Sequence, residues 1–206
     1  VVDDTPMNLS VIKGLLRPTK VYVSTASSGE ECLDLIKDTN YNVVLLDHMM
    51  PGMDGIETIG RIRESYPDLP VYALTANSTA GEDFYLSKGF NGYLTKPIDT
   101  VVLERTILKH LPSGLVQITK VDEAEEELTE IPEDFLWLKD VDGLNVDDGI
   151  KNSGGVPSFI MSVKMFYETI DDNAGIIEKA FKTEELRMFT IKVHSLKTSA
   201  RIVGNR

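Results

Sequence analysis

Five side chains that could hold a metal ion or a phosphoryl group stand directly after short β-rich runs of this sequence. Asp3 and Asp4 follow the first run and Asp47 follows the third, while Thr75 and Lys96 follow the fourth and fifth. Any one of them alone is ordinary, because an Asp after a strand is usually a turn former or a helix cap, and a single Lys is usually solvated. The set is a candidate site because all five residues directly follow β-rich runs.

The elements that carry these residues alternate along positions 1–112. The β-rich runs cover 1–2, 21–25, 42–46, 71–74 and 92–94. The amphipathic helical segments between them cover 7–16, 29–37, 55–65, 81–88 and 101–110. This alternation predicts an α/β domain with a doubly wound, five-stranded parallel sheet and helices on both faces. Such sheets bind ligands beyond the carboxyl ends of their strands, where the strand order reverses.

The first and third strands are neighbours in a doubly wound sheet, so Asp3, Asp4 and Asp47 are expected to converge. Two carboxylates about 4 Å apart repel by roughly 4 kcal/mol at an effective dielectric constant near 20. A hard divalent cation removes this repulsion, and an all-oxygen site with open water positions suits Mg²⁺. A carboxylate beside Mg²⁺ could attack a phosphoryl group and form an aspartyl-phosphate. Lys96 and Thr75 could then stabilise charge on the transferred oxygens.

The stretches VVDD, NVVLLDHMMPGMDGIE, VYALTAN and GYLTKPID together resemble the receiver domain of two-component response regulators. The resemblance covers essentially all of residues 1–112 and implies a flavodoxin-like fold. It implies that Asp47 is the phosphoacceptor. It also implies that Asp3, Asp4, Asp47 and the backbone carbonyl of Met49 hold Mg²⁺.

The same resemblance assigns expected roles to three further residues. Thr75 and Lys96 would contact the phosphoryl group. Tyr93 matches the aromatic switch residue that turns inward when the Thr75 hydroxyl moves toward phosphate. Lys96–Pro97 resembles the cis peptide of the family, which would help to aim Lys96.

Charge and cysteine content narrow the possible functions. The chain has 206 residues, a formal net charge of -12 and one cysteine, Cys32. The negative charge argues against nucleic-acid binding, which needs a basic surface, and a single cysteine excludes a disulfide framework. Residues 113–134 hold one Lys and eight Asp or Glu. This composition predicts a solvated acidic linker between domains at 1–112 and 135–206.

The sequence has no signal peptide, and its apolar run at 43–46 is far too short to cross a membrane. It opens on Val1–Val2 followed at once by two aspartates, as if inside a strand. We therefore expect a cytoplasmic fragment of a larger protein that makes no membrane contact itself, although the parent could be anchored through upstream segments.

Residues 135–206 contain helical patterns without strand alternation. Thr183 is a possible cap for a final helix. In that helix an apolar stripe recurs in steps of three and four, through Leu186, Phe189, Val193, Leu196, Ala200 and Val203. His194 lies off this stripe, on an exposed flank with Lys197, so it could be an ordinary solvated histidine. The helix is basic, which suits an approach to the acidic pocket of Asp3, Asp4 and Asp47. For His48 and His110 we expect no role.

The stretches HSLKTSARIVG and LNVDDGIKNSGG are similar to the histidine-phosphotransfer domain. The resemblance implies an antiparallel four-helix bundle in which His194 accepts phosphate and Lys197 offsets its charge. The sequence ends just after Gly204, before the last long helix of that family, so we expect a partial bundle. Further residues or a partner chain would cover the remaining stripe.

These features predict a phosphorelay segment of a hybrid sensor histidine kinase. Asp47 would accept phosphate from an upstream kinase histidine and pass it to His194, which would deliver it to a downstream response regulator. No glycine-rich ATP-binding motif is present, so this segment would not start the relay. Two alternatives remain open: a docking module switched by phosphorylation with an inert His194, and a Mg²⁺-dependent phosphatase that forms an aspartyl-phosphate.

Overall fold

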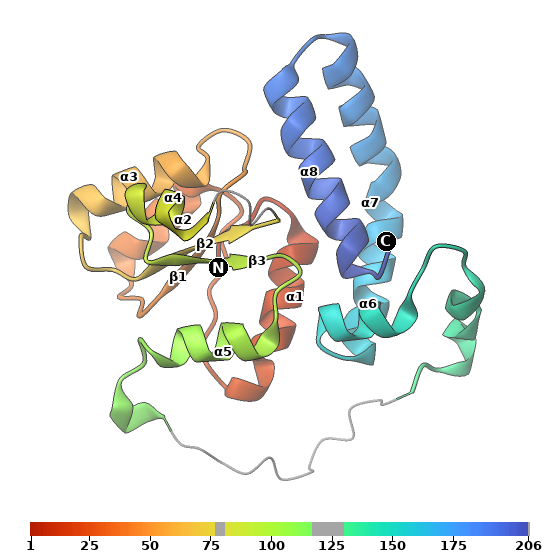
Figure 1. Ribbon diagram of the computed structural model, residues 1–206, viewed down its shortest axis with the longest axis horizontal. Helices are drawn as coiled ribbons and strands as arrows, with labels where there is room; N and C mark the ends of the chain where they lie inside the picture. Colours follow the sequence, from red (N-terminus) through yellow and green to blue (C-terminus); the bar gives the residue numbers. More distant parts are fainter. Residues whose placement is uncertain (77–80, 117–129, 206) are drawn as a thin grey trace.

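The computed structural model describes residues 1–76, 81–116 and 130–205. Figure 1 shows an α/β part and, beside it, a helical part dominated by a long antiparallel helix pair. No helix in the described residues is both long enough and apolar enough to cross a membrane.

The α/β part is built on a parallel sheet. Its strands in the described residues are β1 (Val44–Asp47), β2 (Val71–Thr75) and β3 (Gly92–Thr95), in the order β1-β2-β3. Val44 pairs with Val71, and Tyr72 pairs with Gly92. All four residues of β1 are buried, as expected for a strand that is covered on both faces.

The first two expected strands are present only as single bridges, so the prediction of five full strands is not confirmed. Val2 forms parallel bridges to both Ala26 and Leu46. The predicted run at 21–25 forms no strand, and the bridge lies just after it, at Ala26. The bridges nevertheless place Val2 between Ala26 and β1, as a doubly wound sheet requires.

Helices cover both faces of the sheet. They are α1 (Pro6–Leu16), α2 (Gly29–Asp38), α3 (Gly55–Ser65), α4 (Gly81–Ser87) and α5 (Thr100–Leu108), with short 3-10 turns η1 (Arg17–Thr19) and η2 (Ser113–Leu115). Residues of α2, α3 and α4 share one apolar core with the sheet, and those of α1 and α5 share the other. Ser28, Asp54 and Asp99 cap α2, α3 and α5 through their side chains.

The helical part contains η3 (Glu133–Asp140), α6 (Val146–Ser153), α7 (Val156–Lys182) and α8 (Leu186–Ile202). The predicted cap at Thr183 is wrong. Thr183 ends α7, where its hydroxyl donates to the carbonyl of Lys179, and Glu184 has a positive φ of 58° that separates the two helices. As a result α8 begins at Leu186 without a side-chain cap.

The helical part packs against α1 through a shared apolar core. Ile202 and Val203 are buried in the same cluster as Met7 and Val11 of α1. Gly154 ends α6 in a left-handed conformation (φ 81°), and a Cβ there would lie 2.7 Å from a methyl group of Leu15. This close approach requires glycine.

The expected histidine-phosphotransfer bundle remains a prediction. The described residues form one long antiparallel pair, α7 and α8, with the shorter α6 at its base. The apolar stripe of α8 is incompletely covered, since Leu186 is 72% and Val193 39% exposed. Most of the acidic linker, 117–129, lies outside the described residues.

Candidate functional site

The predicted site residues meet at the carboxyl edge of the sheet. Asp47 is the last residue of β1, Thr75 the last of β2, and Lys96 follows β3. The Lys96 Nζ lies 2.6 Å from an Asp3 carboxylate oxygen and 2.9 Å from Asp47 Oδ2. All four of these side chains are buried. The parallel sheet has therefore brought together residues far apart in sequence, as expected, and the cis peptide expected at Lys96–Pro97 is present.

The acidic cluster fits a divalent cation. Asp3, Asp4 and Asp47 each offer a carboxylate oxygen, and these oxygens lie within 4.8 Å of one another. The donor set is all oxygen and carries three negative charges, which matches the preference of Mg²⁺ for hard ligands. The Met49 amide faces Asp47 Oδ1 at 3.4 Å, so the loop that carries the fourth expected ligand lies beside the cluster.

Asp3 is held in a fixed orientation by neighbours that the sequence did not single out. The Asn8 side-chain amide donates to both of its carboxylate oxygens, at 2.9 and 3.1 Å, and the Thr5 backbone amide donates at 2.9 Å. Asn8 belongs to α1, so the first helix orients one of the predicted metal ligands.

Burial dominates the proton affinities in the cluster. It raises the pKa of Asp47 to about 7, while Lys96 acts in the opposite direction and Asp3 in the same direction. Burial also raises the pKa of Asp4, with Lys192 opposing it. Burial alone would lower the pKa of Lys96, but the carboxylates of Asp3 and Asp47 raise it above its ordinary value. Lys96 is therefore a firmly charged partner for the two acids.

The start of α3 sets the position of the Asp47 backbone. Asp54 caps α3 by accepting from the Glu57 amide at 2.9 Å. Gly55 follows, and a Cβ at that position would meet the backbone of Asp47 and the Cα of His48, the latter at 2.6 Å. Glycine allows the helix to begin directly against the strand that carries Asp47.

Tyr85 links several site residues and was missed by the sequence reasoning. It is 1% exposed and its hydroxyl shares a hydrogen bond with the Thr75 side chain. Its ring stacks on Tyr93, the expected switch residue, at 5.1 Å and also contacts His48 at 5.9 Å. A buried aromatic on α4 gives no sign in the sequence that it differs from an ordinary core residue.

His194 does not lie on an exposed flank, contrary to the prediction. It is half-buried, its Nε2 atom is fully covered without a hydrogen-bond partner, and its ring lies 6.4 Å from that of His48. Burial, with Lys96 and His48 adding to it, lowers the pKa of His194 to about 4. The expectation that His48 has no setting of interest was also wrong, because His48 stands between His194 and Tyr85.

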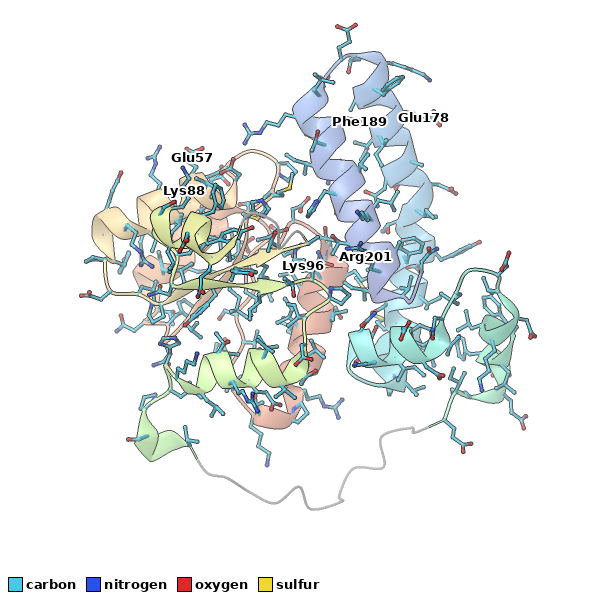
Figure 2. All side chains as sticks on the ribbon, viewed as in Figure 1. Glu57, Lys88, Lys96, Glu178, Phe189 and Arg201 are labelled. Atoms are coloured by element: carbon cyan, nitrogen blue, oxygen red, sulfur yellow. The ribbon has the colours of Figure 1, made fainter. Side chains whose placement is uncertain are left out.

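The reason for this burial is that α8 lies against the α/β part. Lys192 Nζ contacts Asp4 Oδ2 at 3.1 Å, and the hydroxyls of Ser195 and Thr5 are 2.7 Å apart. Nearer the start of α8, Arg187 pairs with Asp54 at 3.1 Å. Figure 2 labels Lys96 at the edge of the sheet that faces α8, and Phe189 and Arg201 toward the two ends of that helix. The basic character of the helix had predicted this acidic partner, although not the contacts.

Lys197, a predicted site residue, and His110, for which no role was expected, both lie outside the acidic cluster. Lys197 is exposed and lies about one turn after His194 on α8. His110 lies away from the cluster, where its Nε2 atom is 2.9 Å from the Tyr72 hydroxyl.

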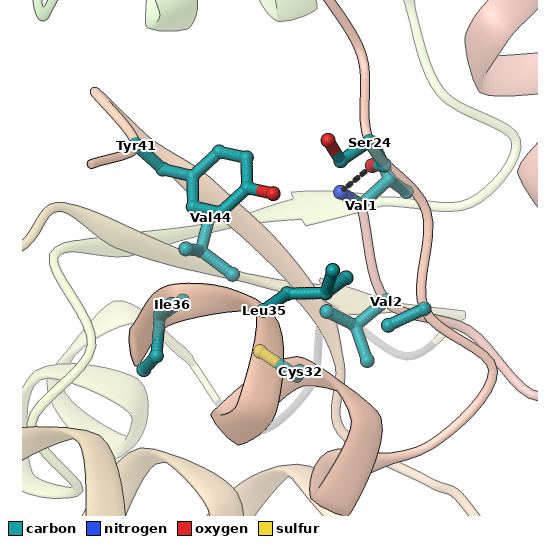
Figure 3. Close-up of a pocket in the computed structure, with 9 residues that line it drawn as sticks. Val1, Val2, Ser24, Cys32, Leu35, Ile36, Tyr41 and Val44 are labelled. Atoms are coloured by element: carbon teal, nitrogen blue, oxygen red, sulfur yellow. Dashed lines mark hydrogen bonds between the residues drawn. The ribbon is translucent and has the colours of Figure 1, made fainter. Parts of the chain in front are cut away.

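A separate small cavity of about 20 Å³ lies at the opposite, amino edge of the sheet. Figure 3 shows the Val1 amine donating to the Ser24 carbonyl (2.9 Å) beside Cys32 and Val44. The lining is apolar, and burial raises the pKa of the Cys32 thiol to about 11. This volume accommodates about one water molecule and no larger ligand.

Comparison with known proteins identifies the family of this chain. Residues 1–108 match the family model of the response regulator receiver domain. The chain therefore belongs to the response regulator receiver family, whose members serve two-component signalling.

Similarity to curated proteins extends past the receiver. The sensor histidine kinase GacS of Pseudomonas protegens is 30% identical over 210 residues, which is 98% of this chain and 22% of that protein. The aerobic respiration control sensor ArcB of Escherichia coli K12 is 29% identical over 88% of this chain and 24% of its own length. The chain thus spans about a quarter or less of these relatives.

Among solved structures, the receiver domain of the sensor histidine kinase PA1611 from Pseudomonas aeruginosa aligns with a TM-score of 0.49 and 30% identity. The alignment covers 53% of this chain and 92% of that one.

Proposed function

We propose that this chain carries two consecutive stations of a phosphorelay, with Asp47 as the first phosphoacceptor and His194 as the second. The observation that carries the proposal is the position of α8, whose histidine faces the receiver beside the residue that follows Asp47. A helix that served only as a spacer would not need a half-buried histidine with a covered, unpaired nitrogen at that place.

In the first step, a carboxylate oxygen of Asp47 attacks the phosphorus of an upstream phosphohistidine. The phosphorus–nitrogen bond breaks and the donor histidine recovers its nitrogen lone pair. The Lys96 Nζ lies 2.9 Å from Asp47 Oδ2. It therefore neutralises charge on the incoming phosphoryl oxygens. Thr75 supplies a hydroxyl donor at the end of the adjacent strand.

Asp3, Asp4, Asp47 and the carbonyl of Met49 are the residues that would hold Mg²⁺. When bound, the cation supplies charge compensation for the carboxylates and the phosphoryl oxygens. Without it the three acids face two lysines, Lys96 and Lys192, so the cluster keeps one negative charge at high pH.

In the second step, an imidazole nitrogen of His194 attacks the phosphorus of the aspartyl-phosphate. The phosphorus–oxygen bond to Asp47 breaks and the carboxylate is restored. Only neutral imidazole has the lone pair for this attack, and the pKa of about 4 keeps His194 neutral at physiological pH. Lys197, one turn later on the exposed side, would offset charge on the phosphohistidine.

The partners follow from this order of transfer. An upstream histidine kinase domain would supply the phosphate, and the receiver of a separate response regulator would take it from His194. The similarity to GacS and ArcB supports a hybrid sensor kinase as the parent protein. In that setting the segment would work in the cytoplasm.

The test is to load the chain with acetyl phosphate and Mg²⁺ and to follow label at both residues. Aspartyl-phosphate and phosphohistidine are separated by their opposite stabilities to acid and base. We expect label at Asp47 first and at His194 later. Asp47→Ala should abolish both signals, and His194→Gln should abolish only the second.

A loaded Asp47 with an empty His194 at all times would contradict transfer and favour the docking module with an inert histidine. Rapid hydrolysis of many small phosphate esters would instead support the phosphatase. The labelling experiment and the hydrolysis assay together separate the three functions considered for this chain.

A further inference from the structure

We infer that Arg187 and Asp54 form a docking pair that holds α8 in register on its own receiver, so that Arg187 is a positioning residue for transfer to His194. The inference rests on the proposed function for its role in transfer, but the docking contact itself stands on geometry. The part of α8 that sets the position of His194 is thus the turn around Arg187, two turns before the histidine.

Arg187 reaches the loop that leaves the phosphorylation site. One of its terminal nitrogens, Nη2, donates to the carbonyl of Gly52 at 3.3 Å and to Asp54 Oδ2 at 3.1 Å. This loop begins immediately after Asp47 and ends at α3. A contact on it therefore links α8 to the segment that carries the first phosphoacceptor.

The acceptor is oriented before Arg187 arrives. Asp54 Oδ1 is occupied as the N-cap of α3, where it accepts from the Glu57 amide at 2.9 Å. The other oxygen, Oδ2, is thus aimed outward by the helix cap. A preorganised acceptor makes a specific contact, because less side-chain freedom is lost when the pair forms.

The other polar contacts of α8 with the receiver lie farther along the same helix. Lys192 pairs with Asp4, and Ser195 is hydrogen-bonded to Thr5. Arg187 precedes His194 by seven residues, or roughly 10 Å along the helix axis. Contacts at both sides of His194 fix the rotation and the axial position of α8, which a single contact beside the histidine would leave free.

Arg187 suits a test better than Lys192 does. The partner of Lys192 is Asp4, an expected metal ligand, so a change there alters metal binding as well. The side chain of Asp54 contacts the Glu57 amide as a helix cap and Arg187 as an ion pair, and Asn retains the cap while removing the charge. The pair can therefore be broken and partly relieved without touching the reacting residues.

The experiment compares Arg187→Glu, Asp54→Asn and the double variant after loading with acetyl phosphate. We expect Arg187→Glu to load Asp47 normally and to slow transfer to His194 roughly three- to fivefold, since exposed ion pairs contribute modestly. The double variant should recover most of the lost rate, because the new repulsion is removed. A purely structural effect of Arg187 would not be relieved by Asp54→Asn.

Arg201→Glu is the matched control. It makes the same charge change on the same helix at an exposed residue, and its transfer rate should equal that of the unaltered chain. Equal rates for Arg187→Glu and the unaltered chain would overturn the inference. A double variant no faster than Arg187→Glu alone would do the same.

Hydrogen–deuterium exchange over α8 tests the docking pair without phosphate. We expect faster exchange in the first turns of α8 for Arg187→Glu, and slower exchange again in the double variant. The exchange rates could change in this way while His194 is never phosphorylated in the unaltered chain. The proposed function would then fail, but the docking pair would stand. Exchange rates in α8 that are the same in the unaltered chain and in both variants would contradict the docking pair.

Discussion

At the scale of single residues, the site consists of buried charges that compensate one another and a histidine kept neutral by its surroundings. Lys96 serves Asp3 and Asp47 together, and Lys192 reaches Asp4 from α8. Each acid in the cluster therefore has a cationic neighbour even before a metal ion is considered. The chemistry depends on which of these charges is removed first.

His194 should titrate well below an ordinary histidine. Burial lowers its pKa from 6.5 to about 4, so the unfolded chain takes up the proton first as the pH falls. The docked form should therefore lose stability as the pH drops from about 6.5 toward 4. NMR titration of the imidazole signals, with His194→Gln for assignment, measures this directly. A midpoint near 6.5 would mean that His194 is solvated, and Arg187→Glu should move the midpoint toward that value.

Removal of Lys96 should destabilise the chain strongly. Lys96→Met leaves Asp3 and Asp47 buried without their shared cation, and breaking a buried pair in this way costs about 3 kcal/mol. Urea unfolding at neutral pH measures the change in the free energy of unfolding, and added Mg²⁺ should restore part of it. Lys37→Met, which breaks only the exposed pair with Asp34, is the control and should change little. A loss below about 1 kcal/mol for Lys96→Met would contradict the assigned role.

At the scale of elements, helix starts and strand ends determine how closely the site is assembled. The carboxyl ends of β1 and β2 and the loop after β3 supply Asp47, Thr75 and Lys96, and α3 begins directly against the first of these. The long helix α8 then crosses this edge. The strands place their site residues at their ends, whereas α8 presents His194 from its middle.

Gly55→Ala should disturb the Asp47 loop, whereas Gly60→Ala should not. A Cβ at position 55 would overlap the backbone at Asp47 and His48, while at position 60 nothing lies within 4 Å. We expect Gly55→Ala to cost about 1–3 kcal/mol by overpacking and to slow loading of Asp47. Gly60→Ala should gain about 0.5–1 kcal/mol from helix propensity. Thermal unfolding and acetyl phosphate loading measure both effects, and similar behaviour of the two variants would exclude the close approach at Gly55.

At the scale of the whole molecule, the helical part and the receiver share a core and so behave as one docked unit. Ile202 and Val203 lie with α1 residues in a single apolar cluster, and the contacts of Arg187, Lys192 and Ser195 extend along α8. This arrangement favours transfer within one chain over transfer between chains.

Transfer from Asp47 to His194 should therefore be independent of protein concentration. Mixing a His194→Gln chain, which can only donate, with an Asp47→Ala chain, which can only accept, forces transfer between chains. We expect this mixture to react more slowly and at a rate that rises with concentration, because each α8 is occupied by its own receiver. Equal rates for the mixture and the unaltered chain would show that the docked arrangement does not direct transfer.

Much of the receiver could be predicted from sequence for a local reason. Period and composition locate its helices closely, as at Gly55–Ser65, where the predicted and observed bounds agree. Residues after successive parallel strands must meet at one edge of the sheet. The convergence of Asp3, Asp47, Thr75 and Lys96 could therefore be predicted from the sequence. The pairing of the first two runs as single bridges was not predicted, because it depends on contacts between segments that are distant along the chain.

The sequence by itself determined the receiver family, and it predicted the acids and the lysine of the site and the histidine on its basic helix. Only the tertiary structure decided that His194 is covered, that His48 and Tyr85 belong to its surroundings, and that Arg187 meets Asp54. The physical reason is distance along the chain. Periodicity reports which face of a helix is apolar, but the contact next to His194 joins Thr5 to Ser195, and no local pattern encodes such a pairing.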